Sequence, residues 1–194
     1  MTDCLTNLFV RHAMRLPAVA AVAQDARLMG IARETLGKEA FPFRATLFDK
    51  SPTANGLVVW HQDTALPLQA RHDAPLWGPW SVKDGVIYAH APESALSQAL
   101  ALGLHLDDST AENGPLRVLP GTQKLGVLTD DALHALSTRI TPAECFVSRG
   151  GVLAMRPLIV HVSSKSQSKA PRRVRHIEYS ASSEVEAGLE LAIA

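Results

Sequence analysis

The sequence predicts a mainly β protein, a double-stranded β-helix (jelly roll) with an N-terminal helix and few other helices. Two observations predict this fold class. Short runs of strand-like alternation recur beyond Phe41, and Gly, Pro, Asn and Asp residues separate them. The dipeptides Asn55-Gly56, Asp84-Gly85 and Asn113-Gly114 are strong hairpin-turn signals. Several short strands joined by such turns are typical of a double-sheet β fold.

The expected helices are few. Residues 17–36 carry apolar side chains at helical spacing, with Pro17 suited to a first turn and Gly37 to a stop, so we expect one helix there. A second, polar helix is expected over residues 129–138. The stretch 67–83 has no clear periodicity, and we expect it to form a loop across the mouth of a pocket.

The expected strands are short. In the clearest of them, over residues 99–106, leucines alternate with small residues, which predicts a strand with one well-packed face. The other strand-like runs cover residues 44–48, 57–61, 86–90, 116–119, 151–162 and 173–179.

Bulk composition restricts the partners. The 194 residues suit one domain spanning residues 1–194. Lysine plus arginine and aspartate plus glutamate each number 19, so no net field favours nucleic acid or a membrane surface, and a small-molecule partner is expected.

No run reaches the ~20 apolar residues of a membrane helix, and the start lacks a signal-peptide pattern. Two cysteines, Cys4 and Cys145, make no disulfide framework, so a cytoplasmic location is expected.

Two His-x-Asp pairs, His61-Gln62-Asp63 and His105-Leu106-Asp107, are candidate metal ligands. Residues two apart in an extended strand point to the same face, so each pair could converge on one ion. A histidine from another strand would complete the two-histidine, one-carboxylate face that non-haem Fe(II) oxygenases use. Spacing alone does not choose between the two pairs.

The surroundings of the two pairs differ. Asp107 ends a strand and runs into a turn, where aspartates commonly bond the turning backbone, so we expect a structural role for it. His61 and Asp63 follow the apolar residues 57–60, where a charged group is expensive unless it is paired or bound to a metal. On this argument alone, a role as metal ligands and a structural role are equally open for the first pair.

Several motifs follow one another in a fixed order: Trp60-His61-Gln62-Asp63-Thr64, Leu104-His105-Leu106-Asp107-Asp108, Glu112-Asn113-Gly114-Pro115-Leu116, Pro120-Gly121-Thr122, Pro157-Leu158-Ile159-Val160-His161 and Arg172-Arg173 before His176-Ile177-Glu178-Tyr179. In this order, from about Phe43 to Tyr179, the chain resembles the phytanoyl-CoA dioxygenase-like family of Fe(II)- and 2-oxoglutarate-dependent oxygenases. One departure is Gln123, which stands where the family's Pro-Gly-Ser-His turn has its histidine.

The resemblance implies which residues form the site. It implies an iron site made by His61, Asp63 and His161. It also implies that Arg172 holds the distal carboxylate of 2-oxoglutarate, helped by the hydroxyl of Ser163. Arginine suits this role because its planar fork binds a carboxylate through two parallel hydrogen bonds. For Ser163, a place in a polar loop is an equally open interpretation.

Other polar and aromatic residues are candidates of a different kind. Trp77, Trp80 and Arg117 are candidates for a substrate pocket, because aromatic walls and one cation suit a small organic acid. The alternatives are tryptophans that anchor the core or a loop, and an arginine in solvent. Arg173 is expected to be solvated, and Lys50 is expected to be a surface lysine outside the site.

The function that the resemblance implies is an Fe(II)- and 2-oxoglutarate-dependent dioxygenase, which uses O2, hydroxylates a small organic substrate and releases succinate and CO2. Asp63 favours hydroxylation, because related halogenating enzymes have a small residue in place of this carboxylate. Two hypotheses compete: a metal-binding jelly-roll protein that does not use O2, either a Zn-dependent enzyme or a small-molecule sensor, and an inert protein whose histidines only pack. Arg172 favours the oxygenase, since a carboxylate clamp has no evident purpose without the co-substrate. The primary substrate, the position hydroxylated and the oligomeric state stay open.

Overall fold

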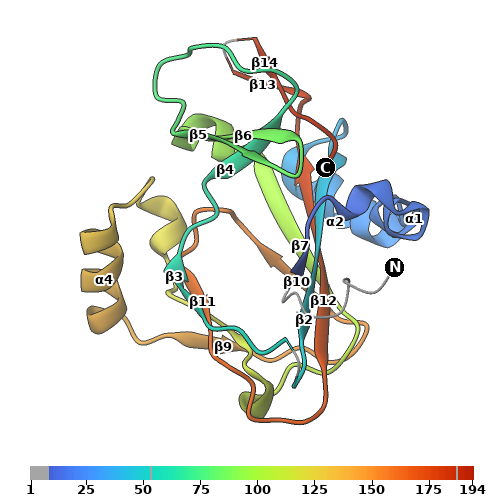
Figure 1. Ribbon diagram of the computed structural model, residues 1–194, viewed down its shortest axis with the longest axis vertical. Helices are drawn as coiled ribbons and strands as arrows, with labels where there is room; N and C mark the ends of the chain where they lie inside the picture. The colour runs from blue at the N-terminus through green and yellow to red at the C-terminus, as the bar shows by residue number, and fades with distance from the viewer. Residues whose placement is uncertain (1–8, 53, 187) are drawn as a thin grey trace.

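The computed structural model describes residues 9–52, 54–186 and 188–194. It confirms the mainly β, jelly-roll fold, in which two larger antiparallel sheets face each other across the interior (Figure 1). One sheet has the strand order β1-β2-β12-β7-β10, and the other has the order β3-β11-β8-β9. A three-stranded sheet, β4-β6-β5, and the hairpin β13-β14 lie at one end of the molecule.

The strands are short, apart from two long ones in the larger sheet. That sheet consists of β1 (Phe9–Val10), β2 (Phe41–Lys50), β12 (Arg172–Ser180), β7 (Ala99–His105) and β10 (Val152–Met155). The facing sheet consists of β3 (Val58–His61), β11 (His161–Ser163), β8 (Leu116–Val118) and β9 (Ala143–Cys145). The smaller sheets consist of β4 (Ala65–Leu68), β6 (Val86–His90) and β5 (Trp80–Lys83), and of β13 (Glu184–Glu186) and β14 (Leu189–Glu190).

The N-terminal helix is divided in two, so the expectation of one helix over residues 17–36 was wrong. Asp25 has extended backbone angles, and its side chain accepts a hydrogen bond from the backbone N–H of Arg27. Such a cap starts a new helix and separates it from the one before. The helical segments are α1 (Pro17–Ala23), α2 (Ala26–Leu36), α3 (Glu93–Leu96), α4 (Asp130–Arg139) and the short 3-10 turns η1 (Ala13–Arg15), η2 (Ala111–Asn113) and η3 (Thr122–Lys124).

Two further expectations of local structure were wrong, and one was confirmed. The run 151–162 is not one strand, because residues 156–160, which include Pro157, separate β10 from β11. The stretch 67–83 is not only a loop, because it contains β5, which pairs with β6. The polar helix is confirmed as α4, which follows Thr129, whose hydroxyl accepts a hydrogen bond from the N–H of Ala132.

Helices α1 and α2 cover the outer face of the larger sheet (Figure 1). Leu100 and Leu102 of β7 pack there with Ile177 and Tyr179 of β12. Each such buried side chain stabilises the fold by about 1.5–3 kcal/mol. The opposite face of β7 is buried as well, and there Gly103 lines an internal cavity, so this strand is packed on both faces rather than on one.

A row of side chains from β2 and β12 points into the interior between the two larger sheets. From Arg172 to Glu178 the two strands pair without a register shift, so every second residue lies on the same face. The cross-strand neighbours along this row, from one end to the other, are Lys50 and Arg172, Phe48 and Val174, Thr46 and His176, and Arg44 and Glu178. We call these eight side chains the inner row. None of the helices in the described part of the chain has the length and apolar character needed to cross a bilayer.

Candidate active site

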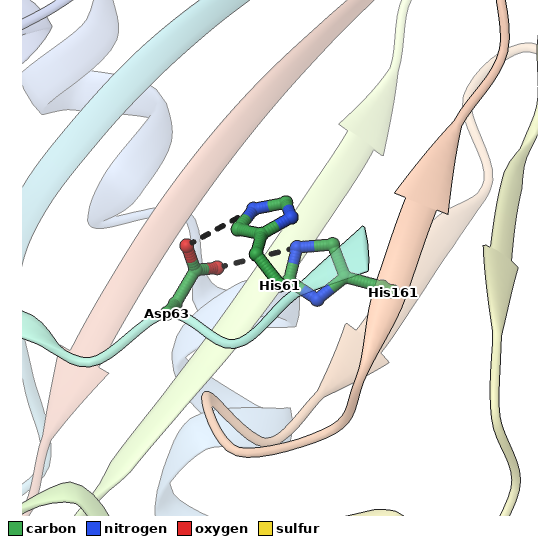
Figure 2. A group of neighbouring side chains, drawn as sticks. All are labelled: His61, Asp63 and His161. Atoms are coloured by element: carbon green, nitrogen blue, oxygen red, sulfur yellow. Dashed lines mark ion pairs between the residues drawn. The ribbon is translucent and has the colours of Figure 1, made fainter. Parts of the chain in front are cut away.

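His61, Asp63 and His161 converge at the edge of the facing sheet (Figure 2). His61 ends β3 and lies directly opposite His161, which begins the antiparallel strand β11. Asp63 follows β3, and its backbone N–H donates to the carbonyl of Pro157 at 2.9 Å. Strand pairing therefore supplies the two histidines, and one backbone hydrogen bond brings the carboxylate to them.

The hydrogen bonds of the two imidazoles leave their Nε2 atoms free to bind a metal. Nδ1 of His61 lies 2.8 Å from the carbonyl oxygen of Val59, and Nδ1 of His161 lies 2.9 Å from that of Ile159. A carbonyl can only accept, so both Nδ1 atoms carry the proton and both Nε2 atoms present a lone pair. The Nε2 atoms lie 3.8 Å and 3.7 Å from the two carboxylate oxygens of Asp63.

Gln62 points away from this group and fixes the segment that carries it. Its amide nitrogen donates to the carbonyls of Leu158 and Gly126, at 2.7 and 3.0 Å, and its amide oxygen accepts from the N–H of Leu128. The residue between the two candidate ligands is therefore a buried anchor. Its three hydrogen bonds hold the chain between His61 and Asp63 in one conformation.

The site is partly open to solvent. His161 is buried, and burial lowers the pKa of its imidazole, although Asp63 acts in the opposite direction. The side chains of His61 and Asp63 are about one-third exposed, at 35% and 29%. A neutral histidine is the form that binds a metal, so the burial of His161 favours ligation.

A second group of possible ligand atoms, on Asp63, His176 and Glu178, lies beside the first. Glu178 is already occupied, because Arg44 donates to both of its oxygens. Burial would raise the pKa of Glu178, but Arg44 and His176 outweigh it and hold this pKa at about 2. Two of the three positions of this group thus form an internal ion network, so the first group is the better candidate for a metal site.

A cavity of about 120 Å³ adjoins the three candidate ligands. Apolar residues such as Val58, Leu116 and Leu153 form much of its wall. Its polar lining includes the three candidate ligands and, at one end of the inner row, Lys50 and Arg172. The same cavity therefore borders the candidate metal ligands and a pair of buried cations.

Those two cations have no carboxylate partner in the described part of the chain. Lys50 is 2% exposed and Arg172 is 7% exposed. The Lys50 Nζ donates to the hydroxyl of Ser163 at 2.7 Å and to the carbonyl of Ser164. Arg172 donates to the same hydroxyl at 3.2 Å and to the carbonyl of Asn113 at 3.2 Å. Burial, followed by the charge of Arg172, lowers the pKa of Lys50 to about 8.

His105 lines the same cavity and is 3% exposed. Its Nδ1 is buried without a hydrogen-bond partner in the described structure. Burial and then the charge of Arg172 lower the pKa of this imidazole to about 4, so it is neutral near pH 7. A buried polar atom without a partner is unfavourable, and a ligand that supplied one would relieve this.

The structure brings five of the predicted site residues to this cavity: His61, Asp63, His161, Ser163 and Arg172. It does not bring the other three. Trp77 belongs to a hydrophobic core cluster, Trp80 packs against that cluster, and Arg117 donates to the hydroxyl of Ser164 at 3.0 Å. None of these three side chains lines either of the cavities described for this protein.

Two neighbours of the candidate residues are separated from the site. Asp107 accepts hydrogen bonds from the backbone N–H and the side chain of Arg173, at 2.8–2.9 Å. Arg173 is exposed, as expected, while Arg172 points into the cavity. The alternation of the strand thus separates the two arginines, and the structure distinguishes them where the sequence did not.

Lys50 is a candidate site residue that sequence reasoning left out, and the expectation of a surface lysine was wrong, because Lys50 is buried. Lys50 is the last residue of β2, and strand pairing sets it beside Arg172. Alternation could have found it, since Arg44, Thr46, Phe48 and Lys50 share one face of a single strand. To use this alternation, one would have to know that this face of β2 points into the interior along the whole strand.

A model of the family described as phytanoyl-CoA dioxygenase (PhyH) matches residues 6–174. The chain belongs to the phytanoyl-CoA dioxygenase (PhyH) family. Membership of the PhyH family confirms the resemblance drawn from the order of the motifs.

Two curated relatives are similar in sequence. L-proline trans-4-hydroxylase from Streptomyces griseoviridis is 28% identical over 192 residues, which cover 86% of this chain and 60% of that protein. Ectoine dioxygenase from Sphingopyxis alaskensis is 30% identical over 139 residues, which cover 69% of this chain and 38% of that protein. The chain thus spans less than two thirds of the length of these relatives.

A solved structure is similar in fold. The apo form of EctD from S. alaskensis superposes with a TM-score of 0.66 at 24% sequence identity. The match covers 93% of this chain and 59% of that one. This similarity supports the jelly-roll assignment for the PhyH-family chain, independently of its sequence motifs.

Proposed function

We propose that this protein is an Fe(II)- and 2-oxoglutarate-dependent dioxygenase that hydroxylates a small organic substrate, with release of succinate and CO2. One observation carries the proposal: two imidazole lone pairs and a carboxylate face one point, and the cavity beside them ends at two buried cations without a carboxylate partner. Family membership and the two curated relatives, which are named as a hydroxylase and a dioxygenase, support it.

The residues present fit both groups. His61, Asp63 and His161 form the two-histidine, one-carboxylate set that suits Fe(II) and leaves coordination positions open. Lys50 and Arg172 would hold the distal carboxylate of 2-oxoglutarate through charge-assisted hydrogen bonds. When bound, Fe(II) and 2-oxoglutarate supply the oxidant that hydroxylates an unactivated C–H bond as the co-substrate is decarboxylated. The protein contributes position, because its own hydrogen bonds fix each of these side chains.

Each polar group has a separate task in this proposal. The carbonyls of Val59 and Ile159 orient the two imidazoles, as hydrogen-bond acceptors of metal-bound histidines commonly do. Ser163 lies between Lys50 and Arg172, accepts from both, and donates to the carbonyl of Gly114 at 2.9 Å. The hydroxyl therefore holds the two cations at one place, and the apolar wall of the cavity keeps water from that place.

The competing function is a metal-binding protein that does not use O2, such as a zinc enzyme or a sensor. The same three ligands suit zinc with a water molecule in the fourth position. The Lys50 and Arg172 end favours the oxygenase, because two buried cations without an anion destabilise a protein unless a ligand pairs with them. A zinc site alone would leave that pair without a purpose.

The test uses the two His-x-Asp pairs as a matched set. Asp63→Ala should abolish Fe(II) binding in anaerobic equilibrium dialysis, and 2-oxoglutarate-dependent succinate release should fall to background. Asp107→Ala should keep both within about threefold, because the interactions that it removes are exposed ones with Arg173, and such an ion pair contributes up to about 1 kcal/mol. Full activity in Asp63→Ala would contradict the proposal. Tight zinc binding by the wild type without any consumption of 2-oxoglutarate would favour the competing function.

A further inference from the structure

A second cavity, of about 180 Å³, borders the candidate metal site from another side. It shares Phe48, Asp63 and His176 with the first cavity, and it extends toward the Arg44 and Glu178 end of the inner row. Asp63, a candidate metal ligand, therefore lies between the two cavities. If the first cavity holds the co-substrate, the second is the place from which another molecule can reach the metal.

The size of this cavity restricts its occupant. Pockets for drug-sized ligands have volumes of about 300–1,000 Å³. The second cavity is smaller than this range, so it fits a compact molecule rather than a long thioester. The exposed side chain of Arg11 lies at its rim, so a compact ligand can enter from solvent.

The charges on its wall do not balance. Arg44 is paired with Glu178, and the charge of Asp63 is required by the metal in the proposed function. Arg11 and Lys83 remain, and neither has a carboxylate partner within residues 9–52, 54–186 and 188–194. The wall is thus positive where substrate would lie.

Aromatic rings hold both of these cations in place. The Arg11 guanidinium lies 4.2 Å from the centroid of the Phe9 ring, and the Lys83 Nζ lies 4.8 Å from that of Tyr88. Burial, then the repulsive charges of Arg11 and Arg44, lower the pKa of Lys83, while Asp63 acts in the opposite direction. An anion placed between them would relieve this repulsion.

We propose that the second cavity is the primary-substrate site and that it takes a small molecule with a free carboxylate, which Lys83 and Arg11 bind. This inference rests on the proposed function and narrows it to a substrate class. The carboxylate is held at the rim, and the rest of the molecule extends past His176 toward Asp63. Neutral sugars and esterified acids lack the group that these cations recognise.

The position of these residues in the fold explains how specificity is separated from the metal site. Arg11 follows β1, and Lys83 ends β5 beside the Asp84-Gly85 turn, so neither belongs to the strands that carry the candidate ligands. The accessory sheet β4-β6-β5 thus supplies a substrate contact that can change while the metal ligands stay. Functions are commonly carried by such peripheral segments on a constant scaffold.

The test screens matched compounds with the full chain, Fe(II), 2-oxoglutarate and O2, and measures succinate. The probes are the L-amino acids and short hydroxy acids, each as the free acid and as its amide. We expect at least one acid to stimulate succinate release and its amide to require at least about tenfold higher concentration, because a charge-assisted hydrogen bond is lost. Lys83→Gln and Arg11→Gln should each raise the half-saturating concentration of the acid by about tenfold. Lys38→Gln, at an exposed lysine of another region, should leave it unchanged.

The outcomes separate the substrate class from the activity itself. Slow succinate release without any added probe shows that the co-substrate is used, so its complete absence in the wild type would overturn the proposed function. If that release is present, equal stimulation by acid and amide, stimulation by no acid of the panel, or unchanged half-saturation in Lys83→Gln would each overturn the carboxylate site. A melting temperature within a few degrees of the wild type establishes that the variants are folded.

Discussion

The two ends of the inner row use the same pair of strands for opposite purposes. At one end Arg44 and Glu178 satisfy each other, with one hydrogen bond of 2.5 Å and a second, shorter contact. At the other end Lys50 and Arg172 lie side by side, and neither meets a carboxylate in the described part of the chain. The first end is complete in the folded chain, whereas the second end is complete only with a ligand.

This difference separates structural charge from functional charge in a single pair of strands. A buried ion pair is strongly destabilised when one partner is removed, because the other is left without compensation. A buried cation without an anionic partner behaves in the opposite way. Its removal should stabilise the fold and weaken only the binding of the anionic ligand. Burial alone therefore does not identify a site residue, and the pairing of the charge does.

The largest expected effect is on stability, at the Arg44 and Glu178 end of the inner row. Glu178→Gln leaves the Arg44 guanidinium buried without a carboxylate, and should lower the free energy of unfolding by about 3–5 kcal/mol. Asp107→Asn removes the partner of the exposed Arg173 and should lower it by less than about 1 kcal/mol. Urea denaturation measures both. Equal losses of stability in the two variants would contradict the special role given to the buried Arg44 and Glu178 pair.

The next largest effect is on 2-oxoglutarate binding, at the Lys50 and Arg172 end of the inner row. Arg172→Gln should raise the dissociation constant for 2-oxoglutarate about 100-fold, since a guanidinium–carboxylate pair contributes up to about 3 kcal/mol. Arg173→Gln should change it by less than about threefold, because that side chain is exposed and bound to Asp107. Anaerobic titration of the Fe(II)-loaded protein measures both constants. Similar losses in the two variants would show that position along the strand does not select Arg172.

Lys50 gives a prediction that depends on pH. Its pKa is lowered to about 8 in the folded protein, whereas the pKa of an unfolded lysine is about 10.4. Between these values the unfolded chain binds more protons, so wild-type stability should rise as pH increases through about 8 to 10. Lys50→Met lacks this contribution. Its stability relative to the wild type should therefore be highest below pH 8 and decline as pH rises.

The same variant should lose co-substrate. Lys50→Met removes one charge-assisted hydrogen bond and should weaken 2-oxoglutarate binding by about tenfold at pH 7. Urea denaturation at several pH values and the anaerobic titration together give both results. A Lys50→Met protein that is less stable than the wild type below pH 8, and binds 2-oxoglutarate equally well, would make Lys50 a structural residue.

The smallest effect is expected at His105. His105 lines the first cavity, and its buried Nδ1 has no hydrogen-bond partner in the described structure, so we expect it to bind the same carboxylate through a neutral hydrogen bond. His105→Ala should raise the dissociation constant for 2-oxoglutarate about two- to tenfold, with Fe(II) affinity unchanged. His105→Asn keeps an N–H donor and should recover part of the loss. An unchanged constant in His105→Ala would exclude this contact.

Much of the fold could be predicted from the sequence because local patterns determined it. The strand over residues 86–90 was predicted with the bounds that β6 has, and Thr129 marked the start of α4. The failures arise where one residue overrides a pattern. Asp25 caps a new helix within an otherwise continuous helical period, and Pro157 divides an apolar run between two sheets.

The site could be predicted in part for a related reason. Motif order gave the three candidate ligands and Arg172, but burial of Lys50 depends on which face of β2 is interior along its whole length. Trp77 and Trp80 were associated with a pocket by residue type, whereas the structure packs them with one hydrophobic core cluster. The cavity of Arg11 and Lys83 joins segments about seventy residues apart, which no local pattern connects.

The most direct test of the central claim compares two 2-oxo acids on the wild-type protein. 2-Oxoglutarate and pyruvate share the 1-carboxylate and 2-oxo groups, but only the former has a distal carboxylate for Lys50 and Arg172. Anaerobic titration of the Fe(II)-loaded protein should give the visible charge-transfer band at a concentration of 2-oxoglutarate at least about 100-fold lower than that of pyruvate. Equal half-saturation by the two acids, or no band with either, would contradict the account.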